Sequence, residues 1–232
     1  MNSKEAIFTR KAIRKYDMNL LDNQVMEDIK VFLKNIKPLF EDIKIEYEIT
    51  SSKNASIKAP HYLAIYSENK ENYLVNVGFM FQQFSLYLTE MGLGSCWTGF
   101  GKPDLAKSNL EYVIMIAFGK AIDNPFRNLN EFNRKSLNEI SNVTDSRLEA
   151  ARLAPSSMNS QPWKIIYDKN KFHVYCVRLG VIKNIFFKKF HKIDIGIMLC
   201  HLYITNRESF NFIILDKPKE IKGYYYIGSL DL

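Results

Sequence analysis

The stretch Ala154-Pro-Ser-Ser-Met-Asn-Ser-Gln-Pro-Trp163 is the most informative part of this chain. It follows a short helical segment, 148–153, and leads into an apolar strand at 164–167. Two prolines and several small hydroxyl side chains are unfavourable inside a helix, so the helix is expected to end near Ala154. The rest is then a rigid loop, called here the serine loop (residues 154–163). It offers backbone N–H groups, hydroxyls and an amide to a polar ligand.

Three other segments, like the serine loop, are short motifs between expected helices and strands. They are Thr9-Arg-Lys-Ala-Ile-Arg-Lys-Tyr16, Met91-Gly-Leu-Gly-Ser-Cys-Trp-Thr-Gly99 and Asn133-Arg-Lys-Ser-Leu-Asn-Glu139. Together with the serine loop they resemble the flavin-binding motifs of the nitroreductase family. The first resembles its phosphate-binding opening, Arg-Arg-Ser-x-Arg, with Ala12 in place of the serine. The second is similar to its Gly-Leu-Gly-x-x-Trp turn beside the flavin ring, and the third to its late basic motif near the flavin phosphate.

The resemblance implies an α+β nitroreductase-like fold, a layered sheet flanked by helices, that binds FMN. Such enzymes pass hydride from NADH or NADPH through flavin N5 to nitro compounds, quinones or similar acceptors by ping-pong kinetics. The flavin carries the chemistry, so no catalytic side chain is expected, and the four histidines show no metal-ligand spacing. The cofactor-binding residues implied are Arg10, Lys11, Arg14, Gly92, Leu93, Gly94, Arg134, Lys135, Pro155, Ser156, Ser157 and Asn159.

The order of these motifs differs from that of ordinary family members, in which the serine loop precedes the glycine turn. The two halves of the chain also resemble each other: Asn76-Val-Gly78 and Asp194-Ile-Gly196 lie 118 residues apart (194 − 76). An internal duplication explains both facts. We therefore expect an N-terminal half (1–119), a linker with the second basic motif (120–144) and a C-terminal half (145–232). They would form one compact pseudo-dimer with one FMN per chain, as a monomer or paired again as a homodimer.

Composition is that of an ordinary globular protein, with 47% hydrophobic and 25% charged residues among 232. The three cysteines form no CxxC pair, and the N-terminal residues lack the apolar core of a secretory signal. These features, and the lack of a long uncharged apolar stretch, predict a cytoplasmic protein without a membrane span. The net charge of +7 is spread along the chain, with no recognisable nucleic-acid-binding module.

Several alternatives stay open at this point. Arg10 and Arg14, four apart in an expected helix, could share a solvated face instead of a ligand-binding one. Gly92 and Gly94 could simply cap a helix. The whole protein could bind flavin for storage, dehalogenation or flavin breakdown, or could have lost the cofactor, since Ala12 removes a donor. A basic nucleic-acid-binding protein is the alternative from another class.

Hydrophobic periodicity and turn residues predict the order of elements. Helices are expected at 3–14, 22–36, 71–91, 145–153 and 192–206. Strands are expected at 43–50, 61–67, 94–100, 111–119, 163–168, 172–178, 211–215 and 223–227.

Overall fold

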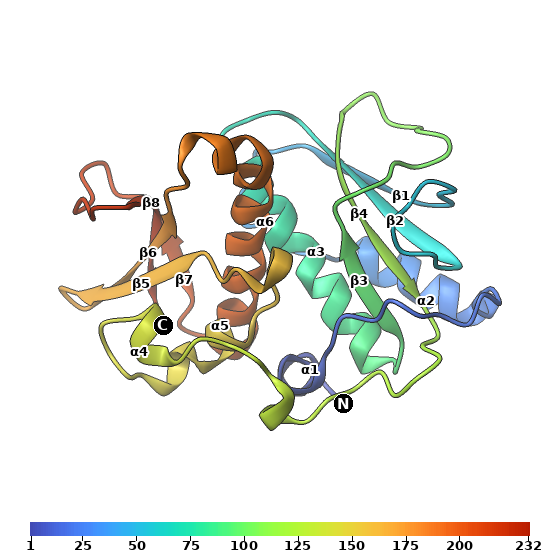
Figure 1. The fold of residues 1–232 in the computed structure, drawn as a ribbon, viewed down its shortest axis with the longest axis horizontal. Helices are drawn as coiled ribbons and strands as arrows, with labels where there is room; N and C mark the ends of the chain where they lie inside the picture. Colours follow the sequence, from blue (N-terminus) through green and yellow to red (C-terminus); the bar gives the residue numbers. More distant parts are fainter.

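The protein contains two four-stranded antiparallel sheets with two long helices between them (Figure 1). The computed structural model describes the backbone of residues 1–232 and the side chains outside 181–186. No described helix has the length and apolar character that crossing a lipid bilayer requires.

The first sheet is built only from the N-terminal part of the chain. Its strands, in spatial order β1-β2-β4-β3, are β1 (Ile45–Thr50), β2 (His61–Ser67), β4 (Glu111–Gly119) and β3 (Gly94–Thr98). Helices α1 (Ser3–Thr9) and α2 (Asn23–Leu33) precede it, and α3 (Tyr73–Glu90) connects β2 to β3. Every residue of β2 is buried, because both faces of this sheet are covered.

The second sheet repeats this arrangement with the C-terminal part of the chain. Its spatial order β5-β6-β8-β7 comprises β5 (Trp163–Asp168), β6 (Lys171–Val177), β8 (Tyr224–Asp231) and β7 (Asn211–Ile213). Helix α6 (Val181–Thr205) connects β6 to β7, as α3 connects β2 to β3. Helix α5 (Glu149–Leu153) follows the 3₁₀ turn η2 (Ser146–Leu148). The mixed helix and sheet fold expected from the sequence is thus confirmed.

Helices α3 and α6 lie side by side at the centre of the molecule, where two glycines let their backbones touch (Figure 1). A Cβ on Gly78 would stand 2.1 Å from the Ile193 carbonyl oxygen, and one on Gly196 would stand 2.0 Å from that of Val75. These contacts are reciprocal, since both 196 − 78 and 193 − 75 equal 118. Such reciprocity is the property of an interface with two-fold symmetry.

The segment between the sheets, 120–144, runs along one edge of the molecule from the first half to the second (Figure 1). It begins as a partner of the N-terminal segment, with Phe126 bridged to Arg10 and Ala121 to Tyr16. It then forms the short helices η1 (Leu129–Glu131) and α4 (Leu137–Ile140) before Ser141 bridges to β5.

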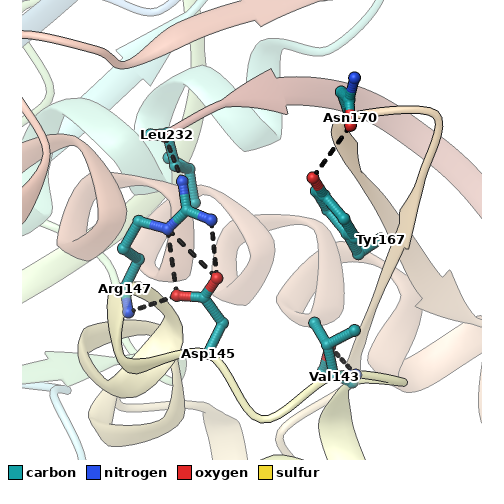
Figure 2. Close-up of polar contacts among 7 residues, drawn as sticks. Val143, Asp145, Arg147, Tyr167, Asn170 and Leu232 are labelled. Atoms are coloured by element: carbon teal, nitrogen blue, oxygen red, sulfur yellow. Dashed lines mark hydrogen bonds and ion pairs between the residues drawn. The ribbon is translucent and has the colours of Figure 1, made fainter.

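Helix α5, which leads into the serine loop, is anchored to the C-terminal end of the chain. Arg147, in the turn before it, donates from Nη1 to the Leu232 carbonyl at 2.6 Å and from Nη2 to Asp145 at 2.7 Å (Figure 2). The Asp145 carboxylate also accepts the Arg147 backbone N–H, capping the turn. The start of the serine loop is therefore fixed relative to the second sheet.

Two sequence expectations about helices are wrong. The first helix ends at Thr9 and not at 14, because residues 10–16 are extended and pair with β3 and with 121–126. Arg10 and Arg14 therefore do not share a helical face. The last helix begins at Val181 instead of 192, directly after Gly180.

Smaller differences concern element ends. The helix expected at 145–153 is a 3₁₀ turn followed by five α-helical residues, and the strand expected at 223–227 extends to Asp231. Strands 61–67, 111–119 and 163–168 have the expected bounds.

Candidate functional site

Three arginines gather where the N-terminal segment meets the 120–144 segment. Arg10 is 1% exposed, and its Nε and Nη1 have no hydrogen-bond partner. Arg127 donates from Nε to the Arg10 carbonyl at 2.8 Å, and its guanidinium lies 3.7 Å from the centre of the Phe132 ring. Arg134 lies 5.7 Å from the same ring. We call Arg10, Arg127 and Arg134 the arginine cluster.

The arginine cluster carries positive charge that the protein does not neutralise. Burial, and next the charge of Arg127, lower the pKa of Arg10 to about 9. Burial and Arg127 lower the pKa of Arg134 to about 10. None of the three forms an ion pair with a carboxylate among the described side chains. Because a buried unpaired cation is unfavourable, this arrangement is suited to an anion.

The second basic motif contacts the serine loop directly. Arg134 donates from Nε to the Ala154 carbonyl at 3.1 Å and from Nη1 to Asn159 Oδ1 at 2.6 Å. Lys135 donates its backbone N–H to Gln161 Oε1 at 2.8 Å and reaches the Ser160 and Gln161 carbonyls with Nζ. Arg134 and Lys135 therefore meet the serine loop in space, and the charge of Arg134 also lowers the pKa of Arg10.

The serine loop has an unusual backbone that its own polar groups stabilise. Met158, Asn159 and Gln161 have positive φ of 50°, 55° and 46°. Ser156 Oγ accepts the Gln161 N–H at 2.9 Å, and Asn159 Nδ2 donates to the Asn133 carbonyl at 2.9 Å. The Ser157 N–H donates to Asp194 Oδ1 of α6 at 3.0 Å.

These hydrogen bonds reduce the number of polar groups in the serine loop that can bind a ligand. The Asn159 amide and the Ser157 N–H, which the sequence suggested as ligand contacts, are already bonded within the protein. The Ser157 hydroxyl makes no hydrogen bond in the described part of the chain, and the Ser156 hydroxyl keeps its own hydrogen for donation. Pro155 is half-buried at the start of the loop.

The glycine turn ends α3 and receives the N-terminal segment. Gly92 (φ 73°) and Leu93 donate to the Thr89 and Leu88 carbonyls at 3.0 and 2.8 Å, the hydrogen bonds of a Schellman cap. A Cβ on Gly92 would meet open space, whereas one on Gly94 would lie 2.7 Å from the Ile13 side chain. Leu93 is buried in the core. Both glycines thus have roles in the protein's own packing.

The N-terminal segment lies along β3 as a consequence. Ile13 donates its N–H to the Ser95 carbonyl at 3.1 Å, and Ala12 bridges to Ser95. Burial raises the pKa of the Cys96 thiol, while the charges of Arg14 and Arg10 oppose that rise. Arg14 is exposed and Lys11 half-buried, and both line a shallow hollow of about 150 Å³ together with Asp123.

A larger hollow, of about 590 Å³, lies elsewhere. It is formed by Tyr175, Arg178 and residues 218–226 at the outer side of the second sheet, and it contains none of the residues suggested by the sequence. Arg127, by contrast, belongs to the arginine cluster but was missed from the sequence. It stands in a polar segment after Pro125-Phe126, where no motif distinguishes it from a solvated cation.

A family model described as "Putative TM nitroreductase" matches residues 2–206. The chain belongs to this nitroreductase family. No curated protein matches it.

Several solved structures of nitroreductase family proteins are similar to this chain. A "putative nitroreductase" of Thermotoga maritima is 24% identical with a TM-score of 0.69, covering 100% of this chain and 94% of that one. A nitroreductase family protein of Clostridium difficile is 18% identical with a TM-score of 0.48, covering 63% and 99%. A "putative nitroreductase" of Exiguobacterium sibiricum, in complex with FMN, is 14% identical with a TM-score of 0.47, covering 62% and 98%. The Thermotoga structure matches the fold over the whole chain, including both sheets.

Proposed function

We propose that this nitroreductase family member is an FMN-dependent oxidoreductase that takes hydride from NADH or NADPH and passes it to nitro compounds, quinones or similar acceptors. The observation that carries the proposal is the arginine cluster beside the serine loop. Its central guanidinium, Arg10, is buried with two nitrogens unbonded and has no acidic partner among the described side chains. The phosphate of FMN supplies the negative charge and the acceptor oxygens that this site lacks.

The residues present fit FMN in the number and sign of their charges. A phosphate monoester carries close to two negative charges at neutral pH, and three arginines converge where it would be held. A dianion there would reverse the lowering of the Arg10 and Arg134 pKa values, since it favours their charged forms. Arg10, Arg127 and Arg134 would thus hold the phosphate. The Ser156 and Ser157 hydroxyls would donate to the polar part of the flavin.

The other cofactor-binding residues predicted from the sequence would surround the arginine cluster and the serine hydroxyls. Arg14 and Lys11 would approach from β3, and the turn through Gly92, Leu93 and Gly94 would set the position of that strand. Lys135 and Pro155 would shape the serine loop. When bound, FMN supplies the hydride chemistry by ping-pong exchange of the nicotinamide and the acceptor. The chain's own task is to bind and orient the ring and to surround the reduced form with donors.

The site would lie between the two halves of one chain. Arg10 comes from the first half, and the serine loop from the second. We propose that the halves arose by duplication, which is supported by the identical sheet orders and the reciprocal Gly78 and Gly196 contacts.

A duplicated chain would have a second position related to the first, and bulky side chains stand there. Residues 37–42 take the place of the serine loop there, and β7 takes the place of β3; the matching bulges of β2 and β6 put Phe212 in register with Trp97. Phe40 packs on Phe212 at this second position, with ring centres 5.8 Å apart, whereas its counterpart Met158 is 82% exposed. This favours one FMN per chain.

The test is an anaerobic titration of the FMN-loaded protein with NADH and then NADPH. Loss of the flavin absorbance at about 450 nm, followed by its return when a quinone is added, is expected for an oxidoreductase. A protein that binds FMN but is not bleached by either nucleotide would have another role, such as flavin storage. A protein that does not bind FMN at all would contradict the proposal.

A further inference from the structure

Asn76 of α3 and Asp194 of α6 hold equivalent loops in the two halves. Asn76 Oδ1 accepts the Leu39 N–H at 2.8 Å, and Asp194 Oδ1 accepts the Ser157 N–H at 3.0 Å. The donors are 118 residues apart (157 − 39), as are the acceptors (194 − 76). The first half therefore shows what the same contact looks like when the side chain is an amide.

The two loops are held to different extents. Asn76 makes two further bonds, accepting the Phe40 N–H at 3.0 Å and donating from Nδ2 to the Phe40 carbonyl at 3.0 Å. Asp194 makes only the bond to Ser157, and its Oδ2 is buried without a partner in the described part of the chain. The residue equivalent to Phe40 is Met158 (40 + 118), and its backbone is not bonded to Asp194.

Met158, whose backbone Asp194 leaves unbonded, lies in the strained part of the serine loop. Met158, Asn159 and Gln161 have left-handed φ, which is unfavourable for side chains other than glycine, and least so for asparagine. None of residues 37–42 in the equivalent loop has a positive φ. The Met158 side chain is 82% exposed, whereas Phe40 packs against the core. The serine loop thus combines strain, an exposed apolar side chain and an unbonded buried carboxyl oxygen.

We propose that the serine loop has a second, docked state, in which the carboxylic acid of Asp194 holds the backbone of Met158 as the amide of Asn76 holds that of Phe40. Asp194 is then a positioning residue. The Met158 N–H would donate to Oδ1, and the acid O–H on Oδ2 would donate to the Met158 carbonyl. Only the protonated acid can dock the loop, because a carboxylate has no hydrogen to donate.

The surroundings of Asp194 favour the acid at neutral pH. Burial raises the pKa of Asp194 to about 8, against the opposing effect of the Ser157 N–H. The Asp194 charge acts on Cys176 of β6, and Tyr225 of β8 lies beside that thiol; His191 and Lys192 are the titratable neighbours of Asp194 along α6. Burial raises the pKa of Cys176 and Tyr225 and lowers that of His191, so these three are uncharged near neutrality. The docked state is therefore available below pH 8 and is lost above it.

Docking would compete with the flavin, a consequence that rests on the proposed function. Phe40 contacts Phe212 of β7, and the equivalent residues are Met158 and Trp97 of β3. Docking would bring Met158 against β3, where the resemblance of residues 92–97 to the family's glycine turn would place the flavin ring. Opening of the loop, favoured by ionised Asp194, would then be required for FMN to enter.

The experiment measures amide hydrogen exchange of the flavin-free, full-length protein at pH 6.5 and 9, corrected for intrinsic exchange. In the wild type, we expect amides of residues 157–161 to exchange at least tenfold more slowly at pH 6.5. Asp194→Asn should keep that slow exchange at both pH values, because an amide donates at any pH. Asn76→Asp, the matched control, should make residues 39–41 pH-sensitive while the serine loop keeps its wild-type behaviour.

A second readout is FMN affinity at pH 8.5, where Asp194→Asn is expected to bind severalfold more weakly than the wild type. Equal corrected exchange at both pH values in the wild type, which needs no variant to fold, would overturn the docked state. Unchanged or tighter FMN binding by Asp194→Asn would overturn its competition with flavin. Docking without any FMN binding would instead contradict the proposed function and leave the switch standing.

Discussion

Arg10 is the residue at which stability and the proposed function oppose each other. Its guanidinium is fully buried beside two other cations, and burial lowers its pKa to about 9. The folded-state pKa lies below the unfolded one, so the cost to folding is complete below pH 9. It falls as pH rises from 9 towards the unfolded value. Such a cost is expected where a side chain is kept for a ligand.

Arg10→Met tests this opposition. We expect the flavin-free variant to gain about 1–3 kcal/mol of unfolding free energy at pH 7, because replacing a buried unpaired charge by an apolar side chain is favourable. FMN affinity should fall by about tenfold or more, since charge-assisted bonds to phosphate are lost. Urea unfolding and flavin fluorescence titration measure the two effects. Arg14→Met, at an exposed position, is the control for stability. A less stable Arg10→Met with normal FMN affinity would contradict this role.

Among single residues, the sequence predicted part of the candidate site. Arg10, Arg134 and the serine loop were expected together, and the structure joins Arg134 to the loop and to the cluster around Arg10. Arg127 could not be found, because its role depends on a bridge between Phe126 and Arg10 that no local pattern encodes. The internal bonding of the Asn159 amide was equally invisible, since it depends on tertiary contact with residues 133–134.

Substitutions in the serine loop distinguish side chains that would contact the ligand from side chains that hold the loop in place. Ser157→Ala is expected to leave stability within about 0.5 kcal/mol, since its hydroxyl makes no bond in the described part of the protein, but to weaken FMN binding. Asn159→Ala should lose about 1–2 kcal/mol, because it breaks bonds to residues 133 and 134 and places alanine at a φ of 55°. Thermal unfolding and FMN titration of both variants provide the comparison. If Ser157→Ala binds FMN normally, the loop's hydroxyls do not contact the flavin.

Strands were easier to predict than helix ends. Strands at 61–67, 111–119 and 163–168 are marked by β-branched and aromatic residues between turn residues. The end of α1 could not be predicted in this way. Residues 10–16 contain good helix formers, but their extended backbone is stabilised by pairing with β3 and residues 121–126. Gly94 permits that pairing by leaving room for Ile13.

For the whole molecule, the contact between α3 and α6 joins the two halves. Gly78→Ala and Gly196→Ala should each destabilise the protein by about 3 kcal/mol, since the added Cβ would collide with a backbone carbonyl on the other helix. The two losses should be similar, because the contacts are reciprocal. Gly92→Ala, which adds strain without collision, should lose only about 1 kcal/mol. Chemical denaturation measures all three, and a neutral Gly196→Ala would contradict the close helix contact.

The similarity of the halves was detectable from a few residues. Asn76-Val-Gly78 and Asp194-Ile-Gly196 keep their spacing because both glycines occupy the same helix crossing and both polar side chains hold a loop. Elsewhere the halves differ, as in the serine loop and residues 37–42, so only the structure shows the shared sheet order.

The most direct test of the whole account is the amount of FMN that the purified chain binds at saturation. One FMN per 232-residue chain, with affinity reduced by Arg10→Met, is the result expected for a single site shared between the two halves. Two equivalents per chain, or saturable binding that Arg10→Met leaves unchanged, would contradict it.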